Sequence, residues 1–327
     1  CIRDRVDASH AGRSIFASIR GFVEEAGPGA IAGVILNRLG SEGHETYLKK
    51  ACAGMDIPVY GMLPKMSELQ WPERHLGLQA SQEQEFPNIE ILSEKAENHL
   101  DLDGILDLIE IPDCSDFSNA SADREIDSVK KIGVARDEAF HFYYRANLEW
   151  LEKSGAEMVQ FSPLKDSELP QNLDGLLIGG GFPEIYAETM SENHSMRQSL
   201  KKAIVSGMPC YAECGGLMLL AESLHTREGR SYPMAGMIPG SVRMTERLQH
   251  FGYCQARFEE GASFRGHEFH YSNWEEESNL ANAWTVRRHA DGSERKEGYQ
   301  RGNLHASYVH LYFPKAAQVL SPLFGLD

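Results

Sequence analysis

Short apolar runs alternate with amphipathic stretches through the first hundred residues of the chain. The runs at 31–37 and 57–63 have the continuous hydrophobicity of buried parallel strands. Residues 44–55 lie between them and have helical periodicity, and 12–27 and 98–110 are two further helical candidates. This alternation of strand and helix predicts an α/β layer fold.

A second α/β series follows a polar, acidic stretch at 112–128, which we interpret as a linker. Its predicted segments are, in order, strand 130–137, helix 147–156, strand 156–164, a strand running into a glycine turn at 174–184, helix 195–207, and a strand entering a helix at 208–224. From about residue 229 the pattern becomes β-like and glycine-punctuated. We therefore expect one domain over 1–111 and a second over 129–327.

The amino-acid composition limits the kinds of molecule that the chain is expected to bind. Lysine and arginine number 32 against 48 aspartate and glutamate, a formal charge of −16. Nucleic acids and anionic membranes require a basic face, so neither is expected as a partner. No apolar run approaches the ~20 residues of a membrane span.

Six scattered cysteines without a CxxC pair favour a reducing cytoplasm over disulfides or zinc. The chain begins at Cys1 without a methionine, and we expect it to be a fragment.

The segment PCYAECGGLMLL, residues 209–220, has the pattern of a nucleophile elbow. A sharp turn between strand and helix holds a reactive atom above the sheet edge, and neighbouring glycines relieve the crowding. The helix N-terminus behind Cys214 favours its thiolate form, which is the nucleophile. The alternative is a small buried core cysteine.

A cysteine nucleophile requires a base, which is usually a histidine distant in sequence. His310 stands in the apolar run ASYVHLYF, although a satisfied core histidine is the alternative. In GGGFPE, residues 179–184, backbone N–H groups at a strand end could bind an oxyanion together with the N–H of Gly215. An ordinary tight turn is the alternative there.

Two further observations on the sequence concern metal binding and phosphate binding. RGHEFHYS, residues 265–272, gathers polar side chains but lacks the helical spacing of a metal motif, so we expect a structural or site-lining role and no metal site. The phosphate-binding motif GxxxxGK[ST] is absent from the sequence.

Taken together, these motifs resemble a known family. YAECGGLM, DGLLIGGGFPE, RGHEFHYS and ASYVHLYF are similar to the glutaminase domain of the cobyrinate a,c-diamide synthases, which are class I glutamine amidotransferases of cobalamin biosynthesis. GRSIFASIRGF, IAGVILNRLGSEGHE, PVYGMLP and LQWPERHLGLQ resemble the second half of that family's ATP-binding domain. The resemblance implies the C-terminal half of a P-loop, dethiobiotin synthetase-like domain followed by a flavodoxin-like amidotransferase domain.

The resemblance also assigns roles in the second domain. Cys214 would be the nucleophile that attacks the glutamine amide, and His310 its general base. The oxyanion and the glutamine would be bound by three glycines: Gly180, Gly181 and Gly215. Many class I amidotransferases carry an acid two residues after the histidine, but this chain has Tyr312 there. We therefore expect a Cys–His dyad.

In the first domain, the resemblance places Asn37 and Pro64 beside the adenine of ATP. It places Arg74 and His75, in PERHLGL, beside the carboxylates of the tetrapyrrole. A strand-end cap, a turn proline and a surface loop explain these residues equally well. The family's Walker lysine, Mg²⁺-binding residues and most phosphate contacts have no counterpart in this chain.

The function implied is ATP-dependent, glutamine-hydrolysing amidation of the a- and c-carboxylates of cobyrinate, with this chain carrying the glutaminase half. Glutamine and cobyrinate would be its substrates, ATP and Mg²⁺ its cofactors, and a homodimer is left open. Three alternatives also remain open. The acceptor could be hydrogenobyrinate or nickel sirohydrochlorin, the chain could be a catalytically silent module, or it could be a cysteine hydrolase.

Overall fold

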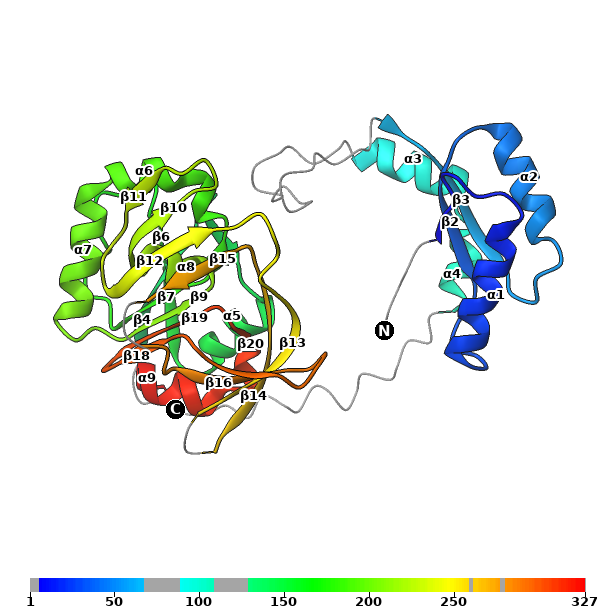
Figure 1. Cartoon of the computed structure of the whole chain (residues 1–327). Helices are drawn as coiled ribbons and strands as arrows, with labels where there is room; N and C mark the ends of the chain where they lie inside the picture. Colours follow the sequence, from blue (N-terminus) through cyan, green and yellow to red (C-terminus); the bar gives the residue numbers. More distant parts are fainter. Residues whose placement is uncertain (1–5, 68–88, 109–128, 259–260, 277–279, 327) are drawn as a thin grey trace. The chain divides into compact units, whose positions relative to one another are not determined.

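The chain divides into two units, Cys1–Asp123 and Arg124–Asp327 (Figure 1). The computed structural model describes residues 6–67, 89–108, 129–258, 261–276 and 280–326. The substrate candidates Arg74 and His75 and the linker at 112–128 lie outside the described residues. Their assignments, and the domain boundaries drawn from that linker, stay predictions.

The first unit contains a three-stranded parallel sheet in the order β1-β2-β3. Its strands are β1 (Val6–Asp7), β2 (Val34–Leu39) and β3 (Val59–Pro64). Helices α1 (Ser14–Ala26) and α2 (Glu42–Cys52) connect them, as the sequence pattern predicted. Their apolar stripes pack on the sheet, and the buried core includes Ile15, Ile19, Leu36 and Leu48.

The predicted single helix over 98–110 is wrong. Helix α3 (Ile89–His99) ends at the second residue of this range, and a short α4 (Leu102–Leu106) begins after a break. Asp101 causes the break, because its side chain accepts a hydrogen bond from the N–H of Gly104 at 3.0 Å and caps α4. The Asp101 N–H donates instead to the carbonyl of Tyr60 at 2.8 Å, which fastens the break to β3.

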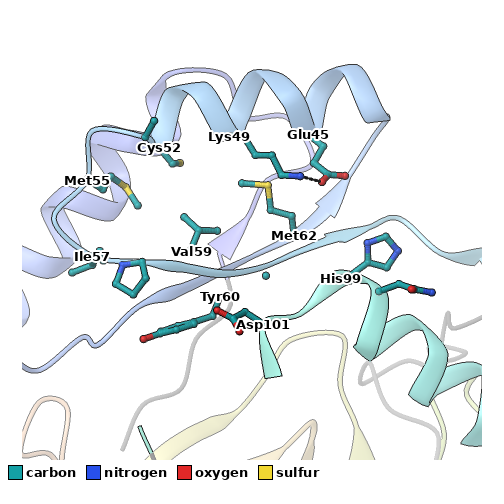
Figure 2. A pocket seen from close by; sticks show the side chains of 14 residues that line it. Glu45, Lys49, Cys52, Met55, Ile57, Val59, Tyr60, Met62, His99 and Asp101 are labelled. Atoms are coloured by element: carbon teal, nitrogen blue, oxygen red, sulfur yellow. Dashed lines mark ion pairs between the residues drawn. The ribbon is translucent and has the colours of Figure 1, made fainter. Parts of the chain in front are cut away.

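A pocket of about 470 Å³ lies in the first unit between α2, β3 and the start of α4 (Figure 2). Glu45 and Lys49, from α2, line it and form an ion pair at 2.6 Å. Neither Asn37 nor Pro64 lines this pocket.

The second unit is built on a six-stranded sheet in the order β18-β19-β9-β7-β4-β6. All neighbours are parallel except β18 and β19. The strands are β4 (Lys130–Ala135), β6 (Ala156–Phe161), β7 (Gly175–Ile178), β9 (Cys210–Glu213), β18 (Tyr299–Arg301) and β19 (Leu304–Ser307). The longer helices are α5 (Arg145–Lys153), α7 (His194–Val205) and α9 (Ala317–Phe324), and α6 (Ala187–Glu192) is shorter. The predicted α/β fold is confirmed.

Two mainly antiparallel sheets follow from the glycine-punctuated half of the sequence. One has the order β11-β10-β12-β15, and the other has the order β17-β16-β13-β14-β20. The first comprises β10 (Ala221–His225), β11 (Ser231–Pro233), β12 (Ile238–Met244) and β15 (Ser272–Glu275). The second comprises β13 (His250–Arg257), β14 (Ser263–His270), β16 (Trp284–Arg288), β17 (Glu294–Glu297) and β20 (His310–Leu311). A small ribbon pairs β5 (Phe140–Phe142) with β8 (Gly180–Gly181).

Two predicted elements are divided in the structure. The helix expected to continue to residue 224 stops after six residues as α8 (Gly215–Leu220), because Ala221 enters β10 and pairs with β12. The N–H groups of Met237 and Gly236 donate hydrogen bonds to the carbonyls of Leu220 and Ala221, respectively, each at 2.8 Å. These bonds stabilise the change from helix to strand. The run ASYVHLYF is likewise shared between β19 and β20, which belong to different sheets.

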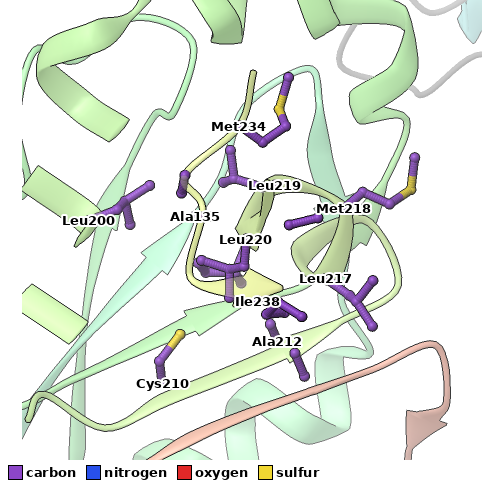
Figure 3. Close-up of a cluster of buried hydrophobic side chains, with 14 of the residues drawn as sticks. Ala135, Leu200, Cys210, Ala212, Leu217, Met218, Leu219, Leu220, Met234 and Ile238 are labelled. Carbon is purple, nitrogen blue, oxygen red and sulfur yellow. The ribbon is translucent and has the colours of Figure 1, made fainter. Parts of the chain in front are cut away.

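Helix α8 is buried on every side, which explains why it carries no polar side chain. Leu217, Leu219 and Leu220 contribute to one hydrophobic cluster with Leu200 of α7 (Figure 3). This packing fixes the strand-to-helix turn that precedes α8.

We expect Leu200→Ala to lower the free energy of unfolding by about 2–5 kcal/mol, because it removes a fully buried side chain and leaves a cavity. Val205, on the same helix, is 70% exposed, so Val205→Ala should change the stability by less than about 0.5 kcal/mol. Urea unfolding followed by circular dichroism measures both. Equal losses for the two variants would contradict the packing described.

Candidate active site

The turn between β9 and α8 places Cys214 at the carboxyl end of the sheet. Its backbone has φ = 48° and ψ = −99°, a conformation that residues with a Cβ rarely adopt. Such strain persists only where the surroundings enforce it. Here the Cys214 N–H donates to the carbonyl of Ser307 at 2.7 Å, and Gly216 packs against the carbonyl of Ile178. The predicted elbow geometry is present, and the Cys214 side chain is 7% exposed.

His310 reaches Cys214 from β20, in a different sheet. Its ring is buried and lies against the glycine turn, where a Cβ built on Gly180 would be 2.7 Å from its Cε1. Burial alone would lower the His310 pKa, but hydrogen bonds with the Cys214 and Glu213 side chains raise it to about 10. The imidazole therefore holds its proton at neutral pH.

Glu213 supplies the carboxylate that the sequence analysis did not find. Its Oε2 lies 3.3 Å from Nδ1 of His310, so the ring's other nitrogen is free to face Cys214. Its Oε1 accepts hydrogen bonds from the Leu311 N–H and the Tyr211 hydroxyl, each at 3.0 Å. A charged residue in the otherwise apolar strand CYAE was the sequence feature that could have identified it. The arrangement is a Cys–His–Glu constellation rather than the predicted dyad.

Asn147, on α5, is a second residue that sequence reasoning missed. This buried side chain donates to the carbonyl of Leu311 at 2.9 Å and accepts from the N–H of Phe313 at 2.9 Å. Together with Glu213, it satisfies both backbone polar groups of Leu311, the residue after His310. The side chains of Glu213 and Asn147 therefore hold the short strand β20 in place through the backbone of Leu311.

The three predicted glycines lie close together beside His310. A Cβ built on Gly215 would lie 3.2 Å from the backbone nitrogen of Gly181, and Gly180 faces His310. Tyr143 anchors the glycine turn: its hydroxyl accepts a hydrogen bond from the Gly179 N–H at 2.9 Å and donates one to the carbonyl of Ala135. Burial raises the Tyr143 pKa, so this hydroxyl stays protonated. The site thus combines a thiol, an imidazole and a glycine turn, the parts needed for acyl transfer.

His310 also borders a cavity of about 1070 Å³. His267 of β14 lies opposite His310 in register, and their rings stack with centroids 5.0 Å apart. Burial and the positive charge of His310 lower the His267 pKa, and the Tyr144 hydroxyl lies 3.2 Å from its Nδ1. The lowered pKa favours a neutral His267 ring, which lines the cavity beside His310.

The first six residues of the block RGHEFHYS, 265–270, lie on β14 and alternate between two faces. Arg265 and His267 line the cavity. Glu268 and His270 are buried on the opposite face, where Glu268 forms an ion pair with Arg295 and His270 bonds the Ser272 carbonyl. Both expected roles, structural and site-lining, are found.

The structure places Asn37 and Pro64 at the carboxyl ends of adjacent parallel strands. The Asn37 side chain caps the following residue, accepting from the Arg38 N–H at 3.0 Å. In the described part of the chain no three acidic, histidine or cysteine side chains are grouped to hold a metal. The sequence contains no GxxxxGK[ST] motif, so it offers no P-loop of that kind for the phosphates of ATP.

Comparison with known proteins agrees with this geometry. A family model described as a CobB/CobQ-like glutamine amidotransferase domain matches residues 131–318. A cobyrinate a,c-diamide synthase of Listeria innocua is 41% identical over 98% of this chain and 73% of its own length. The chain belongs to the cobyrinate a,c-diamide synthase family. It is accordingly an enzyme of the glutamine amidotransferase class, as the sequence motifs predicted.

A second member of the family, from Caldanaerobacter subterraneus subsp. tengcongensis, is 43% identical over 94% of this chain and 69% of its own length. The chain is also similar to a solved structure described as a glutamine amidotransferase, with 17% identity and a TM-score of 0.46; the match covers 59% of this chain and 98% of that one. No described helix has both the length and the apolar character needed to cross a membrane. The relation of the first unit to P-loop domains stays a prediction.

We expect Glu213→Gln to lower the pKa of His310 from about 10, because the neutral amide no longer stabilises the imidazolium while burial still opposes it. NMR titration of the labelled His310 ring measures the change. Glu275→Gln, which breaks an exposed ion pair with Arg243 at 2.8 Å, is the matched control and should leave the titration unaltered. An unchanged His310 pKa in Glu213→Gln would show that the carboxylate does not act on the ring.

Proposed function

We propose that the second unit hydrolyses glutamine and releases ammonia, with Cys214 as nucleophile and His310 as acid and base. The observation that carries the proposal is the buried contact of His310 with Cys214 on one side and Glu213 on the other. Membership of the amidotransferase family supports it.

In the proposed mechanism, the Cys214 thiolate attacks the side-chain amide carbon of glutamine, and a tetrahedral oxyanion forms. Backbone N–H groups of Gly181 and Gly215 stabilise that oxyanion. His310 gives its proton to the departing nitrogen, so ammonia leaves and a glutamyl thioester remains. His310 then takes a proton from water, whose oxygen attacks the thioester. Glutamate and the free thiolate are released.

The ammonia would amidate the a- and c-carboxylates of cobyrinate, the acceptor named in the curated relatives. A carboxylate is a poor acyl donor until it is activated, and we propose that the whole enzyme uses ATP and Mg²⁺ for this, in cobalamin biosynthesis. When bound, ATP supplies the phosphoryl group that activates the carboxylate. Asn37 and Pro64 are the proposed adenine neighbours in this chain, and Arg74 and His75 the proposed substrate neighbours. A homodimer remains a prediction.

Replacing Cys214 with alanine should reduce ammonia release from glutamine by about 10³-fold or more, because no thioester can form. The assay measures ammonia released by the 327-residue chain. Cys210→Ala is the matched control: Cys210 lies on β9, the strand that leads to Cys214, is fully buried, and should be dispensable for turnover.

The outcome also separates the alternatives. If the wild-type chain retains its fold but releases no ammonia with or without cobyrinate, it is either a silent module or a glutaminase that only a complete synthetase domain activates. If release is equal in the wild type and Cys214→Ala, the assigned nucleophile is wrong. Amidation assays of the intact enzyme on cobyrinate, hydrogenobyrinate and nickel sirohydrochlorin identify the acceptor.

A further inference from the structure

The chain passes between the five-stranded and the six-stranded sheet at two points that lie against each other. At the first crossing, Glu297 ends β17 and Gly298 leads into β18. At the second crossing, Ser307 ends β19 and residues 308–309 lead to His310 at the start of β20. Gly298 has φ = 73°, and a Cβ built on it would lie 3.1 Å from the Cβ of Ser307. A glycine at this position therefore allows the close approach of the two crossings.

The carboxylate of Glu297 joins the two crossings by hydrogen bonds. Its Oε2 accepts from the Ser307 hydroxyl at 2.6 Å, and its Oε1 accepts from the Tyr308 N–H at 2.7 Å. The Ser307 hydroxyl also accepts from the Val309 N–H at 2.9 Å. One carboxylate and one hydroxyl thus satisfy the backbone donors of both residues between Ser307 and His310.

The second crossing is connected directly to both catalytic candidates. At one end, the Ser307 carbonyl accepts the hydrogen bond from the Cys214 N–H at 2.7 Å. That bond helps to hold the Cys214 backbone at its positive φ, which persists only where the surroundings enforce it. At the other end, Val309 precedes His310. The bonds of Glu297 therefore reach the nucleophile turn and the histidine through the same short segment.

The side chain of Tyr308, in the middle of this segment, is fixed by other contacts. Its ring stacks on His270 with centroids 3.9 Å apart, and its hydroxyl accepts a hydrogen bond from the Ser272 hydroxyl at 3.0 Å. Loss of the Glu297 carboxylate would leave the ring packed and the Tyr308 N–H without this acceptor. We therefore expect a local shift of the backbone at 307–309, with the fold retained.

The environment of Glu297 is costly for a carboxylate. The residue is only 6% exposed, and burial, followed by the charge of Glu268, raises its pKa to about 7. Apolar residues in place of buried charged groups often give an equally stable or more stable fold. Carboxyl groups with a strongly raised pKa are concentrated at functional sites. Both considerations favour a role for Glu297 beyond stability.

We propose that Glu297 is a positioning residue for glutamine hydrolysis, which fixes the segment 307–309 so that the Cys214 turn and His310 face each other. The inference rests on the proposed glutaminase activity of the second unit. Glu213 bonds the His310 ring and the backbone after it, whereas Glu297 fixes the backbone before it. Two buried carboxylates from different strands thus hold the histidine from its two sides along the chain.

The first test is the kinetics of ammonia release from glutamine by Glu297→Gln. The amide keeps the side-chain length and one acceptor oxygen, so the fold should persist, but it cannot accept both hydrogen bonds. We expect kcat to fall about tenfold, the equivalent of one lost hydrogen bond, while KM for glutamine stays within about twofold. Glu297→Ala, which keeps neither acceptor, should lower kcat by about a hundredfold, so that the conservative variant partly rescues the rate.

Two further measurements do not require glutamine turnover. Labelling of Cys214 by iodoacetamide, followed by peptide mass spectrometry, should slow in both variants. NMR titration should show a His310 pKa below its value of about 10, because the ring loses part of its contact with the Cys214 side chain. A wild-type chain that releases no ammonia would refute the glutaminase proposal, and these two measurements would still decide the role of Glu297.

Two controls separate positioning from stability. Glu294→Gln changes an exposed carboxylate on the same strand and should alter none of these quantities. Ile204→Ala removes buried atoms near the end of α7, where the chain approaches the amino end of β9. It should lower the stability but leave kcat, labelling and the His310 pKa unchanged.

Two results would overturn the proposal. If both Glu297 variants lose stability as Ile204→Ala does, with unchanged labelling and an unchanged His310 pKa, the carboxylate is only structural. If KM for glutamine rises while kcat is unchanged, Glu297 acts in substrate binding and does not position the catalytic candidates. Should Glu297→Ala fail to fold, Glu297→Gln alone decides between these outcomes and the expected one.

Discussion

The buried carboxylate of Glu213 is the interaction on which the site depends. It stands at the end of β9 in the six-stranded sheet and bonds His310 and Leu311 of β20 in the five-stranded sheet. A buried charge is costly unless it is paired and hydrogen-bonded, and here three donors from two strands compensate it. The same contacts fix the position of His310 relative to the Cys214 turn. The contacts that join the two sheets are therefore also those that bring the candidate residues together.

Much of the fold could be predicted because parallel strands buried on both faces and amphipathic helices have distinct hydrophobic periods. The strands ending at Ile178 and Glu213 and helix α7 follow directly from that pattern. The pattern failed where tertiary contacts decide the structure. LMLLAESL is apolar throughout its first half, and only pairing with β12 makes Ala221 the start of a strand.

The site was predictable to the extent that its residues carry local motifs. Cys214 and the glycines have such motifs, and His310 was identified by a polar ring in an apolar run. Glu213 and Asn147 were missed because their importance lies in partners at residues 310–313, and sequence spacing does not reveal that contact. Because Tyr312 stands where many class I amidotransferases carry an acid, a dyad was expected, whereas the structure supplies a carboxylate from the residue before the cysteine.

The most direct test is the rate at which a glutamine-mimicking electrophile labels Cys214 in four proteins: the wild type, Glu213→Gln, His310→Ala and the double variant. If Glu213 acts through His310, Glu213→Gln should slow labelling by about 10²-fold or more in the wild-type background. It should have no further effect when His310 is already alanine, because the cycle isolates their coupling. Independent, multiplicative effects of the two substitutions would contradict a Cys214–His310–Glu213 unit.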